Sequence, residues 1–227
     1  MIFKKMFSRA WLITTLLVFL GSAICVRLGI WQLDRLKQRR AFNAQVETMR
    51  AAELLELNQN VPADISSMEW RAVTVTGEYD FANQVALRNQ YNGDQYGYHL
   101  ITPLIFGATS TDSGQVAVLV DRGFIPADGN ATPTDWRKYD EAGQVTVTGQ
   151  IRLGQEKPTF GGVADAGTGH LDVWNNLNVI RISEQSPYPI LPVYVQPNKV
   201  ENDLPNIREK TIAYFLSVLD IPRQILF

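Results

Sequence analysis

The chain has 227 residues, a formal net charge of −2 at pH 7 and 19% charged residues. A balance this close to neutral lacks the basic footprint of a nucleic-acid-binding protein, so we expect no nucleic-acid partner. The single cysteine, Cys25, excludes an intrachain disulfide, and two histidines, His99 and His170, give no zinc-type ligand spacing. We therefore expect a domain held together by packing alone, without a metal site.

The first element in chain order is an apolar segment near the N-terminus. The run from residue 10 to residue 31 contains one charge, Arg27. As a helix, these 22 residues are about 33 Å long, enough to cross a hydrocarbon core of about 30 Å. We predict a transmembrane helix over 10–31 that follows a cytoplasmic N-terminus over 1–9. A cleaved signal peptide, with small residues at 21–23 near the cleavage site, is the alternative.

Basic residues flank this apolar segment on both sides. Lys4, Lys5 and Arg9 precede it and favour a cytoplasmic N-terminus. The basic residues that follow it argue for the opposite orientation: Arg27, Arg35, Lys37, Arg39 and Arg40. Charge bias alone therefore leaves the orientation open.

A helical pattern continues from Leu28 to about Leu57, so we expect a membrane-exit helix and linker over 32–62. From residue 63 to residue 205 the pattern changes to strands. The pentapeptide VTVTG occurs at 73–77 and again at 145–149, with the period-two alternation of a half-buried strand. Convergent strand composition and a true internal repeat both explain this recurrence.

The remaining segments complete a mainly β domain. We expect strands at 83–89 and 95–106 around an Asn92-Gly93 turn, a buried central strand at 116–120, a short helix at 178–185 and a closing strand at 190–196. Polar loops are expected at 107–114, 127–143 and 161–169. Many short strands without βαβ alternation predict an antiparallel barrel or sandwich with short helices.

Catalytic groups are sparse in this sequence. No GxSxG motif is present, and the usual general base is represented by His99, inside a strand pattern, and His170, after a glycine-rich loop. We expect a structural role for His99 and a solvated position for His170. The carboxylates are scattered without a spacing that defines a pair, so we predict that the chain is not an enzyme.

Three segments together carry a family resemblance. They are residues 29–32 (GIWQ) with Arg35, residues 97–104 (GYHLITPL) and residues 118–126 (VLVDRGFIP). The motif residues are Gly29, Trp31, Gln32, Arg35, Gly97, Tyr98, His99, Pro103, Arg122, Gly123 and Pro126. In this order and spacing, over about residues 12–205, the sequence resembles the surfeit locus protein 1 family.

The resemblance implies a function and a location. Such proteins assist the assembly of haem-copper cytochrome c oxidase, at haem insertion or at maturation of the catalytic subunit. The implied partners are the lipid bilayer and the catalytic subunit or its assembly intermediates. The implied location is the plasma (inner) membrane of a bacterium, with the main domain on the extracytoplasmic side. We expect no resident cofactor; if haem binds, His99 is the ligand inside a family motif.

The motif residues also have physical interpretations. Trp31 and Gln32 suit a membrane interface, either as a generic exit motif or as a partner contact. Gly97 permits a bend or a close backbone approach, and Pro103 places its strand at a sheet edge or ends it. Arg122 is expected to pair with a carboxylate or with backbone carbonyls and to lock the turn, or else to contact a partner.

The sequence departs from the family pattern near its C-terminus. Residues 211–219 are apolar, but as a helix they are about 14 Å long, half a bilayer. Ile207 stands where the family pattern has a histidine, so a haem-ligand role for that histidine does not transfer. We therefore treat 206–227 as the remnant of a second transmembrane helix. These departures motivate an alternative function, a membrane-anchored scaffold unrelated to the oxidase; an anchored hydrolase has the least support.

Overall fold

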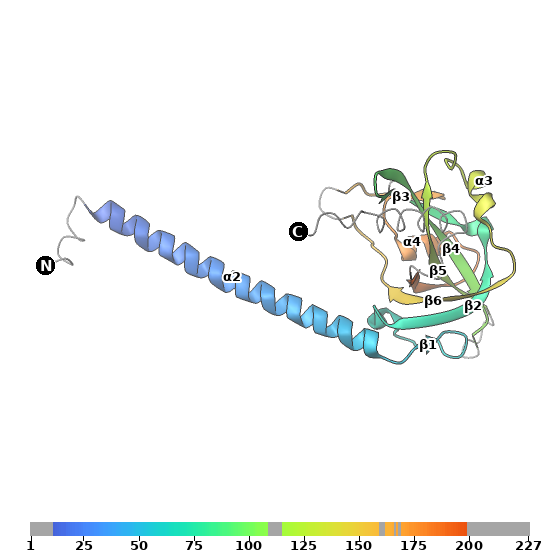
Figure 1. The fold of residues 1–227 in the computed structure, drawn as a ribbon, viewed down its shortest axis with the longest axis horizontal. Coiled ribbons are helices and arrows are strands. Elements are labelled where there is room, and N and C mark those ends of the chain that lie inside the picture. Colours follow the sequence, from blue (N-terminus) through green and yellow to red (C-terminus); the bar gives the residue numbers. More distant parts are fainter. Residues whose placement is uncertain (1–10, 109–114, 159–161, 166, 168, 199–227) are drawn as a thin grey trace, which may run out of the picture. The chain divides into compact units, whose positions relative to one another are not determined.

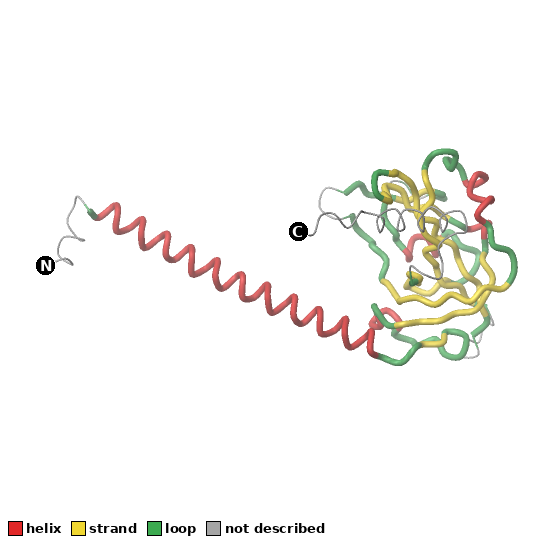
Figure 2. Tube along the Cα trace, in the orientation of Figure 1, coloured by secondary structure: helices red, strands yellow, loops and turns green. Residues whose placement is uncertain are grey.

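A computed structural model describes residues 11–108, 115–158, 162–165, 167 and 169–198 (Figure 1). The chain divides into two compact units, Met1–Thr48 and Met49–Phe227. The first unit is formed by helix α2, Leu12–Ala51, whose last turn belongs to the second unit. The second unit is mainly β, as Figure 2 shows. Its strands are β1 (Leu55–Glu56), β2 (Ala72–Tyr79), β3 (Val85–Asn92), β4 (Gln95–Phe106), β5 (Val116–Pro126), β6 (Gln144–Arg152), β7 (Val173–Trp174) and β8 (Ile190–Pro197).

Helix α2 confirms the expected long apolar helix. Its 40 residues give a length of about 60 Å, none of its described side chains is buried, and its apolar part is long enough to cross a membrane. The predicted end near Leu57 is wrong, because α2 ends at Ala51. Leu55 and Leu57 are buried, and Leu55 pairs with Val73 of β2. Burial of these leucines in the core therefore overrides the local helical pattern.

Five strands of the second unit close into a barrel. Their order is β2-β6-β8-β5-β4, and pairing of β2 with β4 closes the circle. The mainly β prediction with a barrel is confirmed. One pair departs from the antiparallel expectation: β8 runs parallel to β5 while it runs antiparallel to β6. A parallel neighbour requires a crossover connection, and helix α4 (Val179–Glu184) lies in the connection that leads to β8.

The repeated pentapeptide pairs with itself. Residues 73–77 of β2 lie antiparallel to residues 145–149 of β6, with Val75 opposite Val147 at the centre. The threonine hydroxyls meet across the ladder, with oxygen–oxygen distances of 3.2 Å and 2.8 Å. The two copies therefore form the β2–β6 seam of the barrel, with identical cross-strand contacts on either side of the central valine pair.

A glycine ends each copy at a crowded corner of the barrel. A Cβ on Gly77 would lie 2.2 Å from the carbonyl oxygen of Ile105 in β4. A Cβ on Gly149 would lie 2.4 Å from the carbonyl oxygen of Gln196 in β8. Both distances are shorter than any side chain tolerates. Gly77 therefore lets β2 bend against β4, and Gly149 lets β6 bend against β8.

The main core is drawn from all five barrel strands and fills the barrel interior. Its strand residues are Val73, Val75, Leu104, Phe106, Val116, Val118, Val120, Val147, Ile151, Leu191, Val193 and Val195. A second cluster packs Leu119 and Ile101 under Trp174 of β7 and Ile182 of α4. Alternate residues of β5 thus serve the two clusters, which confirms that this strand is central and buried on both faces.

Short elements occupy some of the expected loops. The expected helix at 178–185 is confirmed as α4, where the Asn178 side chain accepts a hydrogen bond from the Arg181 backbone N–H at 3.1 Å. The expected loop at 127–143 is in part helical: it contains α3 (Pro133–Trp136) and the 3₁₀ turn η3 (Arg137–Tyr139), which bury Trp136. The proposed remnant of a second transmembrane helix, 206–227, lies outside the described residues.

Candidate functional site

The two family motifs of the β domain form one ladder. Residues 97–104 lie in β4 and residues 118–126 lie in β5, antiparallel to each other. Gly97 is opposite Pro126, His99 is opposite Phe124, and Leu104 is opposite Val118. Segments that are separate in the sequence are therefore one contiguous piece of the barrel wall.

A β-bulge in β5 shapes the centre of this ladder. His99 and Ile101 of β4 pair with Phe124 and Asp121, so β5 carries one extra residue at this point. Gly123 in the bulge has φ +105°, which favours glycine, and its backbone N–H donates to Asp121 Oδ1 at 3.0 Å. The bulge thus holds the Asp121 carboxylate in place.

Gly97 allows the two strands to approach closely at the other end of the motif. A Cβ at this position would lie 2.0 Å from the carbonyl oxygen of Ile125 and 2.6 Å from ring atoms of Phe124. The predicted close backbone approach at Gly97 is therefore confirmed. Without a side chain at residue 97, the Phe124 ring can lie against the strand, next to His99.

His99 and Asp121 form a hydrogen-bonded pair on the outer side of the ladder. The Nδ1 atom of His99 lies 2.9 Å and 3.0 Å from the two carboxylate oxygens of Asp121. The imidazole packs edge-to-face against Phe124, with 6.3 Å between ring centroids. The side chains are 29% and 13% exposed. The carboxylate therefore fixes the ring orientation of a histidine that solvent or a partner can reach.

A row of polar side chains continues from this pair across β5, β8 and β6. We define the polar row as His99, Asp121, Tyr194, Arg152 and Glu69. Tyr194 of β8 pairs with Leu119 of β5 and with Arg152 of β6. Burial raises the pKa of the Tyr194 hydroxyl; Arg152 opposes this shift, and Asp121 and Glu69 reinforce it. Sequence analysis missed this row because its members are distant in the chain and meet through strand pairing.

Arg152 anchors the far end of the polar row. Its Nε lies 3.3 Å from Glu69 Oε1, and its Nη1 donates to Gln196 Oε1 at 2.9 Å. Its guanidinium lies 3.7 Å from the ring centroid of Trp70, and Arg50 lies over the same ring at 5.6 Å. This stack ties the last turn of α2 to the start of β2 within the second unit.

Arg122 lies among buried groups, next to Asp121 in the chain. It is 2% exposed and donates to Gln84 Oε1 at 3.1 Å and to the backbone carbonyl of Tyr139. Glu141 Oε1 lies 3.5 Å from its Nη2. Burial lowers the pKa of Arg122 and raises that of nearby Tyr79 to about 12. The predicted pairing with a carboxylate and a carbonyl is confirmed, but it joins β5 to η3 and does not lock a local turn.

The expected position of Pro103, at a sheet edge or a strand end, is wrong. Pro103 lies inside the 12-residue strand β4. On one side, β4 pairs with β3 up to Ile101 and with β2 from Leu104 onward. The Pro103 carbonyl accepts from the Asp80 N–H at 2.9 Å on this side. The missing N–H of proline therefore falls where β4 changes neighbours, so no ladder hydrogen bond is lost.

The first motif lies on α2, in the first unit. Gly29, Trp31, Gln32 and Arg35 are all exposed on this helix. The Arg35 guanidinium lies 5.9 Å from the Trp31 ring centroid, one helical turn away. This pairing suits the expected interface position of Trp31, but it does not distinguish an exit motif from a partner contact.

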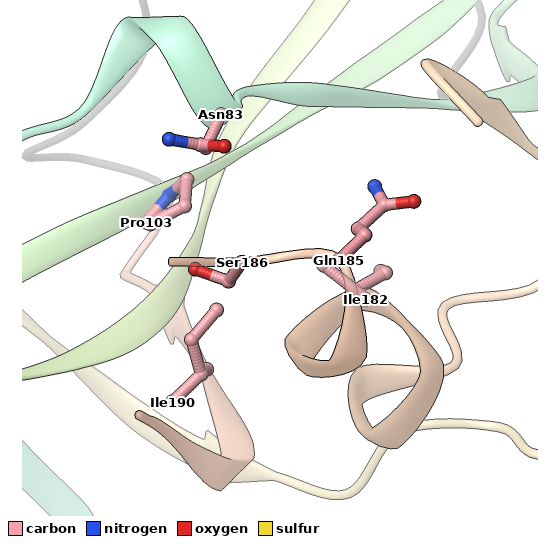
Figure 3. Close-up of a pocket in the computed structure, with 6 residues that line it drawn as sticks. All are labelled: Asn83, Pro103, Ile182, Gln185, Ser186 and Ile190. Carbon is pink, nitrogen blue, oxygen red and sulfur yellow. The ribbon is translucent and has the colours of Figure 1, made fainter. Parts of the chain in front are cut away.

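A tight depression lies where β4, α4 and the start of β8 meet. Figure 3 shows this depression, which is lined by Asn83, Pro103, Ile182, Gln185, Ser186 and Ile190. Its empty volume of about 190 Å³ includes open solvent, and the enclosed part is too tight for a water molecule. His99 is not among these lining residues. The lining of this depression therefore contains no histidine that could ligate haem.

The other titratable candidates have local roles. His170 is more than half exposed and lies 3.1 Å from Asp172, in agreement with its expected solvated position. Asp135 completes the capping box of α3, and the Asp165 carboxylate accepts backbone N–H groups of Asn175 and Asn176. Within the described ranges, no three His, Cys, Asp or Glu side chains are grouped as metal ligands.

Comparison with known proteins places the chain in a family. The family model described as "SURF1 family" matches residues 19–217, which include most of α2 and the whole barrel. The chain belongs to the SURF1 family. The family-level expectation from the β4, β5 and α2 motifs is therefore confirmed.

Individual relatives support the same assignment. The mouse protein "Surfeit locus protein 1" is 26% identical over 63% of this chain and 49% of its own length. A "SURF1-like protein" of Monosiga brevicollis is 30% identical over 59% of this chain and 52% of its own length. A "SURF1-like protein" of Rickettsia bellii is 31% identical over 49% of this chain and 43% of its own length. The chain thus spans about half the length of these curated relatives.

Proposed function

We propose that this member of the SURF1 family is a membrane-anchored assembly factor for haem-copper cytochrome c oxidase. It acts at haem insertion or at maturation of the catalytic subunit. The observation that carries the proposal is the extent of the family match, which runs from the apolar helix through the whole barrel. Assembly of this oxidase is the role that the family resemblance implies.

The lipid bilayer and the oxidase catalytic subunit, or its assembly intermediates, are the proposed partners. Helix α2 supports the first, because it is long and apolar enough to span a bilayer. We propose the plasma (inner) membrane of a bacterium as the location, with the barrel on the extracytoplasmic side. A membrane-tethered barrel would meet the catalytic subunit, itself an integral membrane protein, in the plane of the same membrane.

We propose that the protein works by binding and not by turnover. His99 and Asp121 resemble the base and orienting groups of a hydrolase, but the sequence contains no GxSxG motif that would supply the nucleophile. The polar row offers charge, aromatic surface and a partly exposed imidazole on one outer face of the barrel. Such a surface suits recognition of a protein segment.

The proposed role does not require the protein to carry haem. The depression in Figure 3 has no histidine in its lining, and His99 is not among the residues that line it. We therefore place the action of the barrel on the polypeptide that receives the haem. On this proposal the polar row contacts the catalytic subunit while that subunit matures.

Gene deletion with complementation tests this function. Loss of the gene should lower oxidase activity and the haem content of the oxidase in isolated membranes, and the full-length gene should restore both. A His99→Ala/Asp121→Ala variant should restore neither fully. A His170→Ala/Asp172→Ala variant removes a similar exposed pair outside the polar row and should restore both. Normal oxidase in the deletion strain would refute the proposal.

A second candidate is a membrane-anchored scaffold unrelated to the oxidase. Ile207, at the place of a family histidine, favours it. Affinity capture of the full-length protein in mild detergent separates the two candidates. Oxidase subunits should co-purify with an assembly factor, whereas their absence beside a different membrane complex would favour the scaffold.

A further inference from the structure

We propose that α2 carries a collar that binds the headgroups of anionic phospholipids. The collar is formed by Arg35, Lys37, Arg39 and Arg40, four basic residues within six positions. It follows directly after the apolar part of the helix, which ends at Trp31. This inference rests on the proposed membrane anchoring and adds a lipid preference to it.

The position of the collar along the helix suits the headgroup layer. Residues 35–40 follow Trp31 by 4 to 9 positions, a rise of about 6–14 Å along an α-helix. A headgroup layer adds about 5–8 Å to each side of the hydrocarbon core. Because α2 is unbroken from Leu12 to Ala51, the collar stays at this distance from the apolar segment. Long arginine and lysine side chains can then reach the phosphates from just outside the layer.

Few acidic residues lie near the collar in the sequence to neutralise its positive charge. Between Arg27 and Val46 the one acidic residue is Asp34, which lies 4.0 Å from Lys37 Nζ. That pair is exposed at both ends, so its attraction is largely screened. The collar keeps a positive excess although the whole chain has a net charge of −2. A run of charges can be an ordinary solvated helix face, but this run is acid-poor and begins next to an interface tryptophan.

The basic side chains of the collar are spread over more than half of the helix circumference. Successive residues turn by about 100°, so relative to Arg35 the side chains of Arg39, Arg40 and Lys37 point at about 40°, 140° and 200° around the axis. All four residues are exposed. Arg35 lies over the Trp31 ring, which keeps one guanidinium close to the expected interface. An arc of about 200° can face several lipids at once, whereas a single protein surface would face a narrower side of the helix.

Selective fluorescence quenching in lipid nanodiscs tests the collar. The full-length chain carries Trp11→Phe, so that Trp31 is the one tryptophan left in the apolar segment 10–31. Trp70, Trp136 and Trp174 remain, and the same chain with Trp31→Phe added gives their contribution to the signal. Two nanodisc preparations have the same proportions of phosphatidylcholine and phosphatidylglycerol, and the tail bromines are on one lipid or on the other. At low salt, the quenching should indicate that the ratio of phosphatidylglycerol to phosphatidylcholine beside Trp31 is on the order of tenfold higher than in the bulk membrane. Near 1 M salt the enrichment should largely disappear, because the Debye length is then about 3 Å.

Two variants separate charge from other effects. Replacement of all four collar residues by glutamine keeps helix-forming side chains and should remove the enrichment. A triple Arg35→Lys/Arg39→Lys/Arg40→Lys variant keeps the charge and should retain most of it. If each brominated lipid quenched Trp31 of the unmodified chain in proportion to its bulk share, the collar proposal would be overturned and the membrane anchor would stand. Failure of the chain to insert, with no quenching of Trp31 by either lipid, would instead refute the anchoring on which it rests.

Discussion

Arg122 provides the sharpest test of how the barrel is held together. Its guanidinium is buried and donates to the Gln84 side chain and the Tyr139 carbonyl. The Cζ atom of Arg122 also lies 5.0 Å from the ring centroids of both Tyr79 and Phe81. We expect Arg122→Ala to lower the free energy of unfolding substantially. The Tyr139 carbonyl would lose a charged donor, and the space left behind would be lined by aromatic rings.

The size of this loss follows from the contacts. A hydrogen bond to a charged group contributes about 1.5–3 kcal/mol, and a buried cation–π contact adds up to about 2 kcal/mol. These contributions overlap, and removal of one member of a buried charged network typically costs about 3–5 kcal/mol. We therefore expect about 4 kcal/mol for Arg122→Ala. Arg122→Lys, which keeps the charge but loses the planar fork, should cost about half as much.

Urea unfolding of the full-length protein in detergent measures this change. Fluorescence of the buried residues Trp136 and Trp174 reports on the second unit. Arg137→Ala is the matched control, because Arg137 lies in η3 and is exposed; it should change the free energy by about 0.5 kcal/mol or less. Glu141→Gln should also have a small effect, since Glu141 is 42% exposed. An Arg122→Ala loss under about 1 kcal/mol would refute the assigned role.

Three further predictions concern the barrel. Gly149→Ala should destabilise the barrel by about 3 kcal/mol in the same urea assay, because the added Cβ would clash with the carbonyl oxygen of Gln196. Gly169→Ala is the control and should be neutral, because a Cβ there would have nothing within 4 Å. Equal effects of the two substitutions would contradict the role of Gly149 at the barrel corner. Burial tends to raise the pKa of Asp80, but hydrogen bonds from Tyr188, Asn83 and the Ala82 N–H lower it overall. The resulting stability is present above the unfolded pKa near about 4 and is lost as the pH falls below it, so Asp80→Asn should flatten the acid limb of a stability–pH curve; an unchanged limb would contradict this. Finally, protein purified with haem supplied should retain no Soret band, and a stoichiometric band abolished by His99→Ala would contradict the proposal that the barrel acts without carrying haem.

The sequence predicted the barrel strands well where the hydrophobic pattern is local. Alternating valines and threonines marked β2 and β6, the apolar run at 116–120 marked β5, and Asn92-Gly93 marked the hairpin between β3 and β4. Asn178 marked the start of α4 through its capping side chain. In each case, the residues that form the element also contain the sequence pattern that predicts it.

Other features depend on contacts between distant residues. The two-residue strands β1 and β7 exist because each finds a parallel partner, in β2 and β3 respectively. The end of α2 was misplaced because burial of Leu57 is decided by the barrel. The polar row joins Glu69 to His99 through four strands, and no local pattern indicates it.

The pairing of the two VTVTG copies has a consequence for folding at high concentration. A five-residue segment that pairs antiparallel with its duplicate can form the same valine and threonine contacts with that segment of another molecule. While the barrel is still open, β2 of one chain can therefore meet β2 or β6 of a neighbour in the same alignment. Closure of the barrel, in which Gly77 lets β2 reach β4 and Gly149 lets β6 reach β8, removes this alternative pairing.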